Sequence, residues 1–397
     1  MNNTSLRVNR LSESATIAMA RKARELKSQG QDVISLSLGE PDFNTPDFIK
    51  DAAKQGIDQN YSKYMPVNGY LDLREAISKK FSRDNDINYT ADQIVVSTGA
   101  KQSIANVVLS CINPGDEVIV PAPFWVSYEE IIKMAEGTPV FIETSIENDF
   151  KITPSQLKNA ITDKTKMMIY SSPCNPSGSV YSKDELRSLA DVLVNYPLIT
   201  IVSDEIYEHI NFTSKYFSMG AFSDMYNQVV TVNGVSKSFA MTGWRLGYIG
   251  APIWLAKACT KIQGQFTSGT SGISQRAALA AISADPIVIN DMKTAFLKRR
   301  DFILTELSKI KGIKINKPQG AFYVFPDVSS FFNKSYKDYT IKNSDDLTIY
   351  ILESAKVALV TGNAFGSPNC VRISYASSIK SLQIAVRRIA DSLNRLQ

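Results

Sequence analysis

Two cationic side chains stand eight residues apart in a segment whose composition is unusual for a protein core. The apolar run 228–233 predicts a buried strand, and a turn of small residues then leads to Lys237. Arg245 follows in Thr-Gly-Trp-Arg-Leu-Gly, where glycines on both sides would let the backbone approach a ligand closely. An amine can bond the carbon of an aldehyde, and a guanidinium can bind a phosphate. The pair therefore predicts a site for a ligand with both groups, although Lys237 taken alone would better fit a solvated loop.

A carboxylate and a phenol form a second group on the preceding strand. The run 198–203 predicts a buried strand, and Asp204 stands at its carboxyl end. A carboxylate in that position needs a cation or a proton donor as its partner. Tyr207 follows three residues later, and Lys237 lies 33 residues after Asp204. Because open α/β sheets bind ligands at the carboxyl ends of their strands, this spacing predicts one shared site.

The segment 236–247, Ser-Lys-Ser-Phe-Ala-Met-Thr-Gly-Trp-Arg-Leu-Gly, resembles the lysine signature of the class I pyridoxal-phosphate aminotransferases. Within that family it is similar to the bacterial aspartate aminotransferase subgroup, which includes aspartate/prephenate enzymes, and the similarity extends over about residues 5–395. The resemblance implies the cofactor pyridoxal 5'-phosphate and the α/β fold of fold type I transferases. That fold has a large domain, in which a mostly parallel seven-stranded sheet lies between helices, and a smaller α+β domain.

The resemblance also implies roles for these residues. Lys237 would hold the cofactor aldehyde covalently and, once released, would move the proton between the substrate α-carbon and the cofactor. Asp204 would pair with the pyridine nitrogen, and Tyr207 would hydrogen-bond the phenolic oxygen. Arg245 would bind the phosphate.

A strand, a glycine turn and a helix start are predicted to meet within residues 94–111. Unpaired N–H groups and the positive end of the helix dipole make such a junction an anion site, so Gly99, Ala100 and Lys101 are predicted to cradle the phosphate. The same pattern also fits an ordinary strand-to-helix turn. By resemblance, Lys101 would face the second carboxylate of a dicarboxylic substrate. Tyr64 would reach the cofactor phosphate of the neighbouring subunit, in a homodimer with shared active sites.

Four further residues are assigned to the cofactor or the substrate. Trp125 could be a core residue, but its position matches the family's aromatic residue that stacks on the pyridine ring. Asn175 lies in an Asn-Pro-Ser-Gly turn and by resemblance contacts the phenolic oxygen and the substrate, with a cis bond to Pro176. Gly39 would offer the substrate a backbone contact. Arg372 could be a solvated charge on an edge strand, but it aligns with the arginine that binds the substrate α-carboxylate.

The elements that must position these residues alternate between strand and helix from about residue 94, which is typical of a parallel sheet covered on both faces. Thr153 and Ser182 each begin a capping box and so predict helix starts. Beyond the lysine motif the strand alternation is expected to stop. Residues 253–285 are predicted to be mostly helical, and a long helix is predicted over 287–311.

The chain is predicted to form two domains, as its 397 residues and 44% apolar composition allow. Residues 1–48 would join the small domain, residues 49–286 would form the large cofactor-binding domain, and residues 287–397 would form the small C-terminal domain. An amphipathic helix over 13–30 and a short strand over 33–38 would belong to the first of these segments.

Composition narrows the classes of function. Lysine and arginine total 44 against 39 aspartate and glutamate, and the charges are interspersed, so no nucleic-acid surface is predicted. No apolar run is long enough to cross a membrane, and the first residues lack the apolar stretch of a signal peptide, which favours a cytoplasmic protein. The single histidine, His209, argues against histidine triads and histidine-rich metal sites, and it is expected to support the site or to lie at the surface. The cysteines are far apart in the sequence, so free thiols are expected, with no metal site and no disulfide framework. They are Cys111, Cys174, Cys259 and Cys370.

Together these inferences predict a ping-pong aminotransferase that moves the amino group between L-aspartate and 2-oxoglutarate, with prephenate as a further acceptor. Relatives active on prephenate use a basic residue in the first segment, where Ser12 stands in this chain, with Arg10 close by. An aminotransferase for alanine or aromatic amino acids, or a pyridoxal-phosphate lyase acting at the β-carbon, would keep the same cofactor residues. A cofactor-binding transcription regulator is disfavoured, because no DNA-binding domain precedes residue 30.

Overall fold

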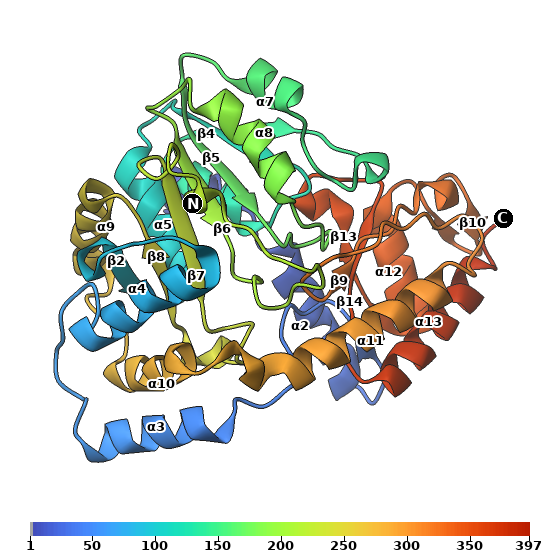
Figure 1. Ribbon diagram of the computed structural model, residues 1–397. Coiled ribbons are helices and arrows are strands. Elements are labelled where there is room, and N and C mark those ends of the chain that lie inside the picture. The colour runs from blue at the N-terminus through green and yellow to red at the C-terminus, as the bar shows by residue number, and fades with distance from the viewer. Residues whose placement is uncertain (1–2) are drawn as a thin grey trace.

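A seven-stranded sheet forms the centre of the larger part of the molecule (Figure 1). The structure is a computed structural model and describes residues 3–397. Neighbouring strands run parallel except in the two pairs formed by β8, which confirms the predicted mostly parallel sheet. In sheet order the strands are β2 (Ile94–Ser97), β8 (Gly247–Gly250), β7 (Val229–Gly234), β6 (Thr200–Asp204), β5 (Thr165–Ser171), β3 (Glu117–Pro121) and β4 (Thr138–Ile142).

Helices cover both faces of this sheet. Val108 of α5 packs in one apolar cluster with Val230 of β7, and Leu189 of α8 packs with Ile201 of β6 in another. Because successive residues of a strand point to opposite faces, the strands β3, β5, β6 and β7 each supply both clusters, which explains their nearly continuous apolar runs in the sequence. The helices of this part are α3 (Asp47–Asp58), α4 (Leu71–Asn85), α5 (Ala100–Cys111), α6 (Ser127–Met134), α7 (Pro154–Ala160), α8 (Lys183–Leu193), α9 (Ile253–Phe266) and α10 (Gly272–Ser283).

Both predicted capping boxes are present at helix starts. The Thr153 side chain accepts from the backbone of Gln156 at the start of α7, and Gln156 reaches back to the backbone of Thr153. Ser182 and Glu185 make the same reciprocal pair at α8. These caps satisfy N–H groups that the first helical turn leaves without a partner.

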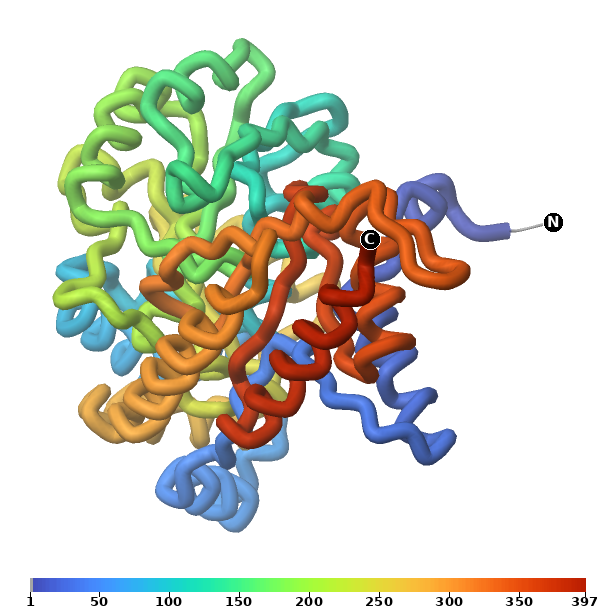
Figure 2. Tube along the Cα trace, turned by 90° about the vertical axis from the view of Figure 1, so that its right-hand side faces the viewer, coloured from blue at the N-terminus to red at the C-terminus, as the bar shows by residue number. Residues whose placement is uncertain are grey.

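A smaller α+β part combines the N-terminal segment with the C-terminal residues. Figure 2 shows the N-terminal helix α2, in blue, beside the orange and red C-terminal elements, and Ala23 packs with Leu352 and Ala358 in one cluster. The short strand β1 pairs in parallel with β12. The two ends of the described chain are therefore folded together, and the three-stranded sheet β13-β14-β9 lies between helices. The elements of this part are α1 (Leu6–Asn9), α2 (Ala15–Ser28), β1 (Ile34–Ser35), α11 (Asn290–Leu307), β9 (Tyr323–Val324), β10 (Ser335–Tyr336), β11 (Tyr339–Thr340), α12 (Ser344–Ala355), β12 (Val357–Ala358), β13 (Val360–Thr361), β14 (Val371–Ser374) and α13 (Ile379–Leu393).

Three sequence predictions need correction. The strand expected over 33–38 is regular only at β1, because the backbone beyond it makes other contacts. The helix expected over 287–311 is shorter: a 3-10 turn capped by the side chain of Asp285 precedes α11. The strand alternation also continues into β8. The glycines of β8 fit against close neighbours, since a Cβ at Gly250 would lie on the ring of Tyr89.

Two expectations about the chain as a whole can be checked on residues 3–397. All four cysteines are free thiols there, as predicted. Among the helices in this range, none is both long enough and apolar enough to span a membrane.

Candidate active site

A cavity of about 290 Å³ opens at the carboxyl ends of β6 and β7, between the larger and the smaller part of the molecule. Its walls come from both parts and from the N-terminal segment. The position is the one expected for a ligand site in an open α/β sheet. The predicted site residues that line it are Gly39, Ala100, Lys101, Trp125, Asn175, Asp204, Tyr207, Lys237, Arg245 and Arg372.

Asp204 is the last residue of β6 and is 5% exposed. Burial raises the pKa of its carboxyl group to about 6, while a hydrogen bond from Tyr128 and one from the backbone of Ile206 oppose the rise. The Tyr128 hydroxyl donates to Asp204 Oδ2 at 2.6 Å, and the Ile206 N–H donates to Oδ1 at 3.2 Å. The carboxylate is thus held in place by two donors but has no ion-pair partner within 4 Å in the described chain. It can accept a hydrogen bond from a protonated ring nitrogen.

Lys237 stands three residues beyond the end of β7, and its ammonium donates to the carbonyl of Gly39 at 2.6 Å. Burial lowers the pKa of Lys237 to about 8; Glu40 opposes this effect, and Arg372 and Arg245 add to it. A lysine with a lowered pKa supplies more free amine near neutral pH. That amine is both a nucleophile for a carbonyl carbon and a base.

Arg245 and the N-terminus of α5 form a cationic corner of the cavity. Arg245 adopts a left-handed backbone conformation with φ 55°, and its Nη1 donates to the carbonyl of Thr242 at 2.8 Å. Gly99, with φ 84°, lies against the guanidinium so closely that a Cβ there would collide with it. Gly99 does not line the cavity itself, whereas Ala100 and Lys101 do. The first N–H groups of α5 have no partner within the helix, so this corner suits an anion such as a phosphate.

Arg372, in β14, is 2% exposed, which excludes the alternative of a solvated edge charge. Its Nη1 donates to Asn175 Oδ1 at 2.9 Å, and its Nη2 donates to the carbonyl of Ser37 at 2.6 Å. The guanidinium lies between the rings of Tyr323 and Phe365, 4.6 Å and 4.9 Å from their centroids. Its Nε is buried and has no hydrogen-bond partner in the described chain. A buried cation with a free donor and no carboxylate partner is a receptor for an anionic group.

Trp125 lines the same cavity, and the Lys101 ammonium lies 5.0 Å from its ring centroid. Burial, together with Arg245, lowers the pKa of Lys101. The peptide bond between Asn175 and Pro176 is cis, as predicted.

Two tyrosines of the site were missed from the sequence. Tyr128 lies in α6, one helical turn after Trp125, and holds Asp204. The Tyr323 hydroxyl lies 2.8 Å from that of Tyr207, and its ring stacks on Arg372. A one-turn spacing from Trp125 was the available signal for Tyr128, but for Tyr323 no comparable pattern exists.

Three residues named from the sequence lie away from this cavity in the single chain. Tyr64 is 98% exposed and lines a separate surface pocket with Ser268. Its reach into a neighbouring subunit stays a prediction. Arg10 forms an ion pair with Glu136 at 3.6 Å, and the backbone N–H of Ser12 donates to a glutamate, so neither side chain contributes a charge to the cavity.

His209 is mostly buried beside the site and does not line the cavity, in agreement with a supporting position. With Asp84 and Glu208 it forms the one group of possible metal ligands found in residues 3–397.

Comparison with known proteins gives the same fold and the same family. The sequence model of the protein family aminotransferase class I and II matches residues 31–389 of this chain. An aspartate/prephenate aminotransferase of Nitrosomonas europaea is 46% identical over 394 residues, covering 98% of this chain and 99% of the relative. The aspartate aminotransferase structure from Rhizobium meliloti has a TM-score of 0.96 at 38% identity and covers 100% of both chains. The Thermus thermophilus aspartate aminotransferase with maleate has a TM-score of 0.93 at 39% identity, covering 99% of this chain and 100% of the other.

The enzymes of this family depend on pyridoxal 5'-phosphate, and the residues of the cavity fit that cofactor. The glycine that accommodates Arg245 and the start of α5 suits its phosphate, the buried carboxylate of Asp204 suits its ring nitrogen, and the amine of Lys237 suits its aldehyde. The family match over most of the chain and the shared fold confirm the family inferred from the lysine motif. The chain therefore belongs to the class I and II aminotransferases, as a pyridoxal-phosphate-dependent transaminase.

Proposed function

We propose that this enzyme transfers the amino group of L-aspartate to 2-oxoglutarate in two half-reactions, giving oxaloacetate and L-glutamate, and that prephenate is a further acceptor. The observation that carries the proposal is the pair of cations at the substrate end of the cavity. Arg372 has an unpartnered Nε, and Lys101 stands on another wall with its ammonium over Trp125. Two separate cations suit a substrate with two carboxylates. The relatives named for aspartate and for prephenate support the same choice.

Arg372 is proposed to bind the α-carboxylate of the substrate. Its guanidinium is fixed by Asn175, by the carbonyl of Ser37 and by two aromatic rings, so little freedom is lost when the substrate binds. A fixed carboxylate orients the bond between the α-carbon and its hydrogen. Lys101 is proposed to bind the distal carboxylate, with Asn175 and the backbone of Gly39 as further substrate contacts.

Lys237 is proposed to carry the proton. Its lowered pKa leaves part of the amine free near neutral pH, so it can take a proton from the substrate α-carbon and return it at the cofactor. When bound, pyridoxal phosphate supplies an electron-withdrawing ring that accepts the electron pair released at the α-carbon. Asp204, held by Tyr128, would keep the ring nitrogen protonated, and Tyr207 would hydrogen-bond the phenolic oxygen. Trp125 would stack on the ring, and Arg245, Gly99, Ala100 and Lys101 would hold the phosphate.

The oligomer and the domain limits are part of the same proposal. We take residues 49–286 as the large domain, with residues 1–48 joining the small domain of residues 287–397. The exposed Tyr64 supports a homodimer in which each site borrows this tyrosine from the partner. A mixed dimer tests this point: if sites are shared, combining Tyr64→Ala chains with Lys237→Ala chains restores one intact site per dimer. We also propose a cytoplasmic location.

A panel of amino donors with 2-oxoglutarate, extended to prephenate as acceptor, tests the function. We expect aspartate to be the best donor, with glutamate formed in equal amount to the oxaloacetate. Faster turnover of alanine or of aromatic donors would favour the alternative aminotransferases. Pyruvate and ammonia formed from cysteine or cystathionine without an oxo acid would identify a lyase. The purified protein should be yellow, and borohydride should abolish the absorption band by fixing the cofactor to Lys237.

A further inference from the structure

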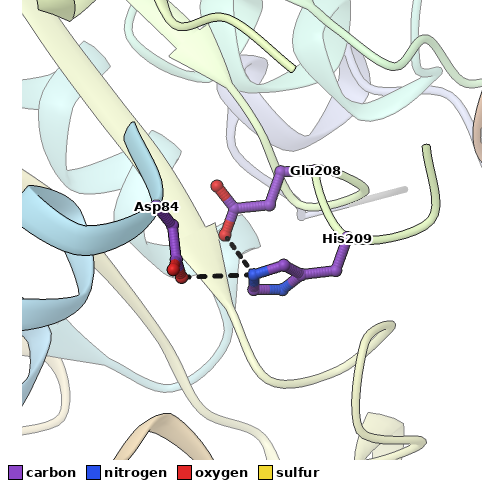
Figure 3. Close-up of side chains that lie close together, drawn as sticks. All are labelled: Asp84, Glu208 and His209. Carbon is purple, nitrogen blue, oxygen red and sulfur yellow. Dashed lines mark hydrogen bonds and ion pairs between the residues drawn. The ribbon is translucent and has the colours of Figure 1, made fainter. Parts of the chain in front are cut away.

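A buried polar cluster lies behind the cavity, on the side of the sheet ends that faces α4. We define it as Lys80, Asp84, Asn85, Glu205, Glu208 and His209. Glu205 directly follows the cavity residue Asp204, so two neighbouring residues face the cluster and the cavity respectively. Figure 3 shows Asp84, from α4, and His209 and Glu208, from the segment after β6, pointing toward one another. Of these, Lys80, Asn85, Glu205 and Glu208 are less than 5% exposed.

Hydrogen bonds and ion pairs within the protein hold the buried polar cluster together. The Lys80 ammonium forms an ion pair with Glu208 and donates to Asn85 Oδ1 at 2.7 Å. Asn85 in turn donates to Glu208 Oε2 at 2.7 Å and to Glu205 Oε2 at 3.1 Å. Although Asp84, Glu208 and His209 could ligate a metal, Lys80 already pairs with Glu208 and Arg83 with Asp84. The cluster is therefore complete without an ion.

His209 links this cluster to the residue next to Lys237. Its Nε2 lies 3.2 Å from Asp84 Oδ2 and 3.6 Å from Glu208 Oε1. Two carboxylates at Nε2 favour a proton on that nitrogen. Nδ1, on the other side of the ring, forms a hydrogen bond with the Ser238 hydroxyl at 3.2 Å. Ser238 is 1% exposed, and His209 is the one hydrogen-bond partner of its hydroxyl in residues 3–397.

We propose that His209 is a positioning residue for Lys237, acting through Ser238 and anchored by Asp84. The inference rests on the proposed role of Lys237. The segment after β7 is an irregular turn, in which Phe239 N–H donates to Val235 O at 3.2 Å. The turn is anchored in the core by Val235, Phe239 and Met241, and the Ser238 side chain adds a polar contact next to Lys237. The chain Asp84–His209–Ser238 ties it to the C-terminal end of α4, a helix of 15 residues packed in the core. The link fixes where the amine of Lys237 stands relative to Asp204.

Three single variants separate this role from a merely structural one. His209→Gln places an amide nitrogen where Nε2 stands and keeps the bond to Asp84, but it loses the bond to Ser238. His209→Asn can meet Ser238 but does not reach Asp84. Ser238→Ala removes the link and leaves the buried polar cluster intact. Each is prepared as the full chain with bound cofactor, together with the double variant His209→Gln/Ser238→Ala.

The first measurement is the pH titration of the visible absorbance of the bound cofactor, which reports the environment of Lys237. We expect Ser238→Ala and His209→Gln to shift the midpoint by about 0.5 to 1 pH unit and to lower kcat about 3- to 10-fold, which corresponds to the loss of one neutral hydrogen bond. The double variant should show no larger change than either single variant. His209→Asn keeps the contact with Ser238 but loses the anchor at Asp84, so its midpoint should shift in the same direction.

The second measurement is amide hydrogen exchange of the same loaded proteins. Exchange in residues 235–241 should be faster in Ser238→Ala and His209→Gln, while exchange in β6 and β7 stays unchanged. An unchanged midpoint and unchanged exchange in both variants would overturn the proposal. Additive effects in the double variant would overturn it too, because the two side chains would then act independently. A wrong role for Lys237 gives a different result. In that case Lys237→Ala keeps full turnover, whatever the His209 variants show.

Discussion

The cavity and the buried polar cluster are built from the same strand ends, yet their charges are arranged in opposite ways. Asp204 faces the cavity and the next residue, Glu205, faces the cluster; Lys237 faces the cavity and Ser238 the cluster. The cavity is lined by the cations Lys101, Lys237, Arg245 and Arg372 and by the single carboxylate of Asp204, and Arg372 has an unpartnered donor. In the cluster, lysine, carboxylates and amide bind one another.

The difference separates charges that await a ligand from charges that stabilise the fold. Burying an ion without a partner costs several kcal/mol, so a buried cation such as Arg372 persists only where an anion completes the site. A paired cluster needs nothing further, and breaking it affects folding first. Substitutions in the two regions should therefore affect different quantities: turnover for the cavity, and the free energy of unfolding for the cluster.

Lys237→Ala should give the largest effect. Removing the group that moves the proton should lower kcat about 10⁴-fold, the upper end for general acid–base catalysis. The protein should still bind cofactor through Arg245 and Asp204, and its melting temperature should change little. Steady-state kinetics with aspartate and 2-oxoglutarate measure the loss. Lys261→Ala, on the exposed side of α9, is the control. A Lys237→Ala enzyme within tenfold of wild type would contradict the proposed role.

Lys80→Met tests the role of the buried polar cluster in stability. It leaves Glu208 as a buried carboxylate without its cation, and the free energy of unfolding should fall by about 3–5 kcal/mol. Urea unfolding at one fixed protein concentration measures this. Lys309→Met breaks an exposed ion pair with Glu306 and should cost less than about 1 kcal/mol. Turnover per folded molecule should change far less than in Lys237→Ala. Equal stability of the two lysine variants would refute the pairing argument.

Glu205→Gln probes the pH dependence of the cluster. Burial, together with Glu208, raises the pKa of Glu205 from 4.5 to about 8, so the folded protein holds this proton more tightly than the unfolded chain does. The resulting stability is fully present below about pH 4.5 and is lost as the pH rises through about 8. A glutamine is neutral at every pH, so the variant should lose this part of the dependence of the unfolding free energy on pH. Over the whole range the difference should be a few kcal/mol at most. Urea unfolding of both proteins from pH 5 to 8.5 measures this difference. If the unfolding free energy of the two proteins depends on pH in the same way, the glutamate is ionised over this whole range.

Arg372→Lys keeps the positive charge of the cavity but removes the planar fork. We expect kcat/KM for aspartate to fall about 10²-fold, because a buried charge pair loses geometry that lysine cannot reproduce. Arg187→Lys is a matched control, since Arg187 binds Asp224 with two parallel hydrogen bonds of 3.0 Å at the surface. A loss confined to stability, with unchanged kcat/KM, would remove Arg372 from the substrate site.

Lys101→Ser should give the smallest effect and the most selective one. Because Lys101 is proposed to face the distal carboxylate, the ratio of kcat/KM for aspartate to that for alanine should fall about tenfold. The two donors are measured with the same acceptor. Equal losses for both would mean that Lys101 serves the cofactor and not substrate choice.

Sequence reasoning reached the parts of the site that chain connectivity fixes. Asp204 and Lys237 follow apolar runs that become β6 and β7, and neighbouring parallel strands must bring their carboxyl ends together. Tyr128 could not be found in this way, because its partner Asp204 is 76 residues away and a tyrosine on a helix fits the core equally well. The strand β8 was missed for a related reason: its two glycines, Gly247 and Gly250, fit the space left by distant neighbours, and glycine carries little strand preference.

The pairing between Lys80 and Glu208 was invisible in the sequence as well. Charged residues in an amphipathic helix normally predict a solvated face, whereas Lys80, in the C-terminal half of α4, lies in the interior. Likewise, the sequence around Tyr64 does not indicate that its side chain is exposed, and its reach into a partner's site is a prediction from the family resemblance. Local patterns thus predict the elements and the strand-end residues, while pairs of residues far apart in the sequence are defined only by the three-dimensional fold.

The stretch that follows β1 has a mechanical consequence. β1 is joined to β12 in the smaller part, and two carbonyls just beyond it hold the fork of Arg372, through Ser37, and the amine of Lys237, through Gly39. The proposed carboxylate-binding arginine and the nucleophilic lysine are therefore both bound to the same short segment. A displacement of the smaller part would therefore move the contacts of Arg372 and of Lys237 together, and the position of one side chain would not change without the other.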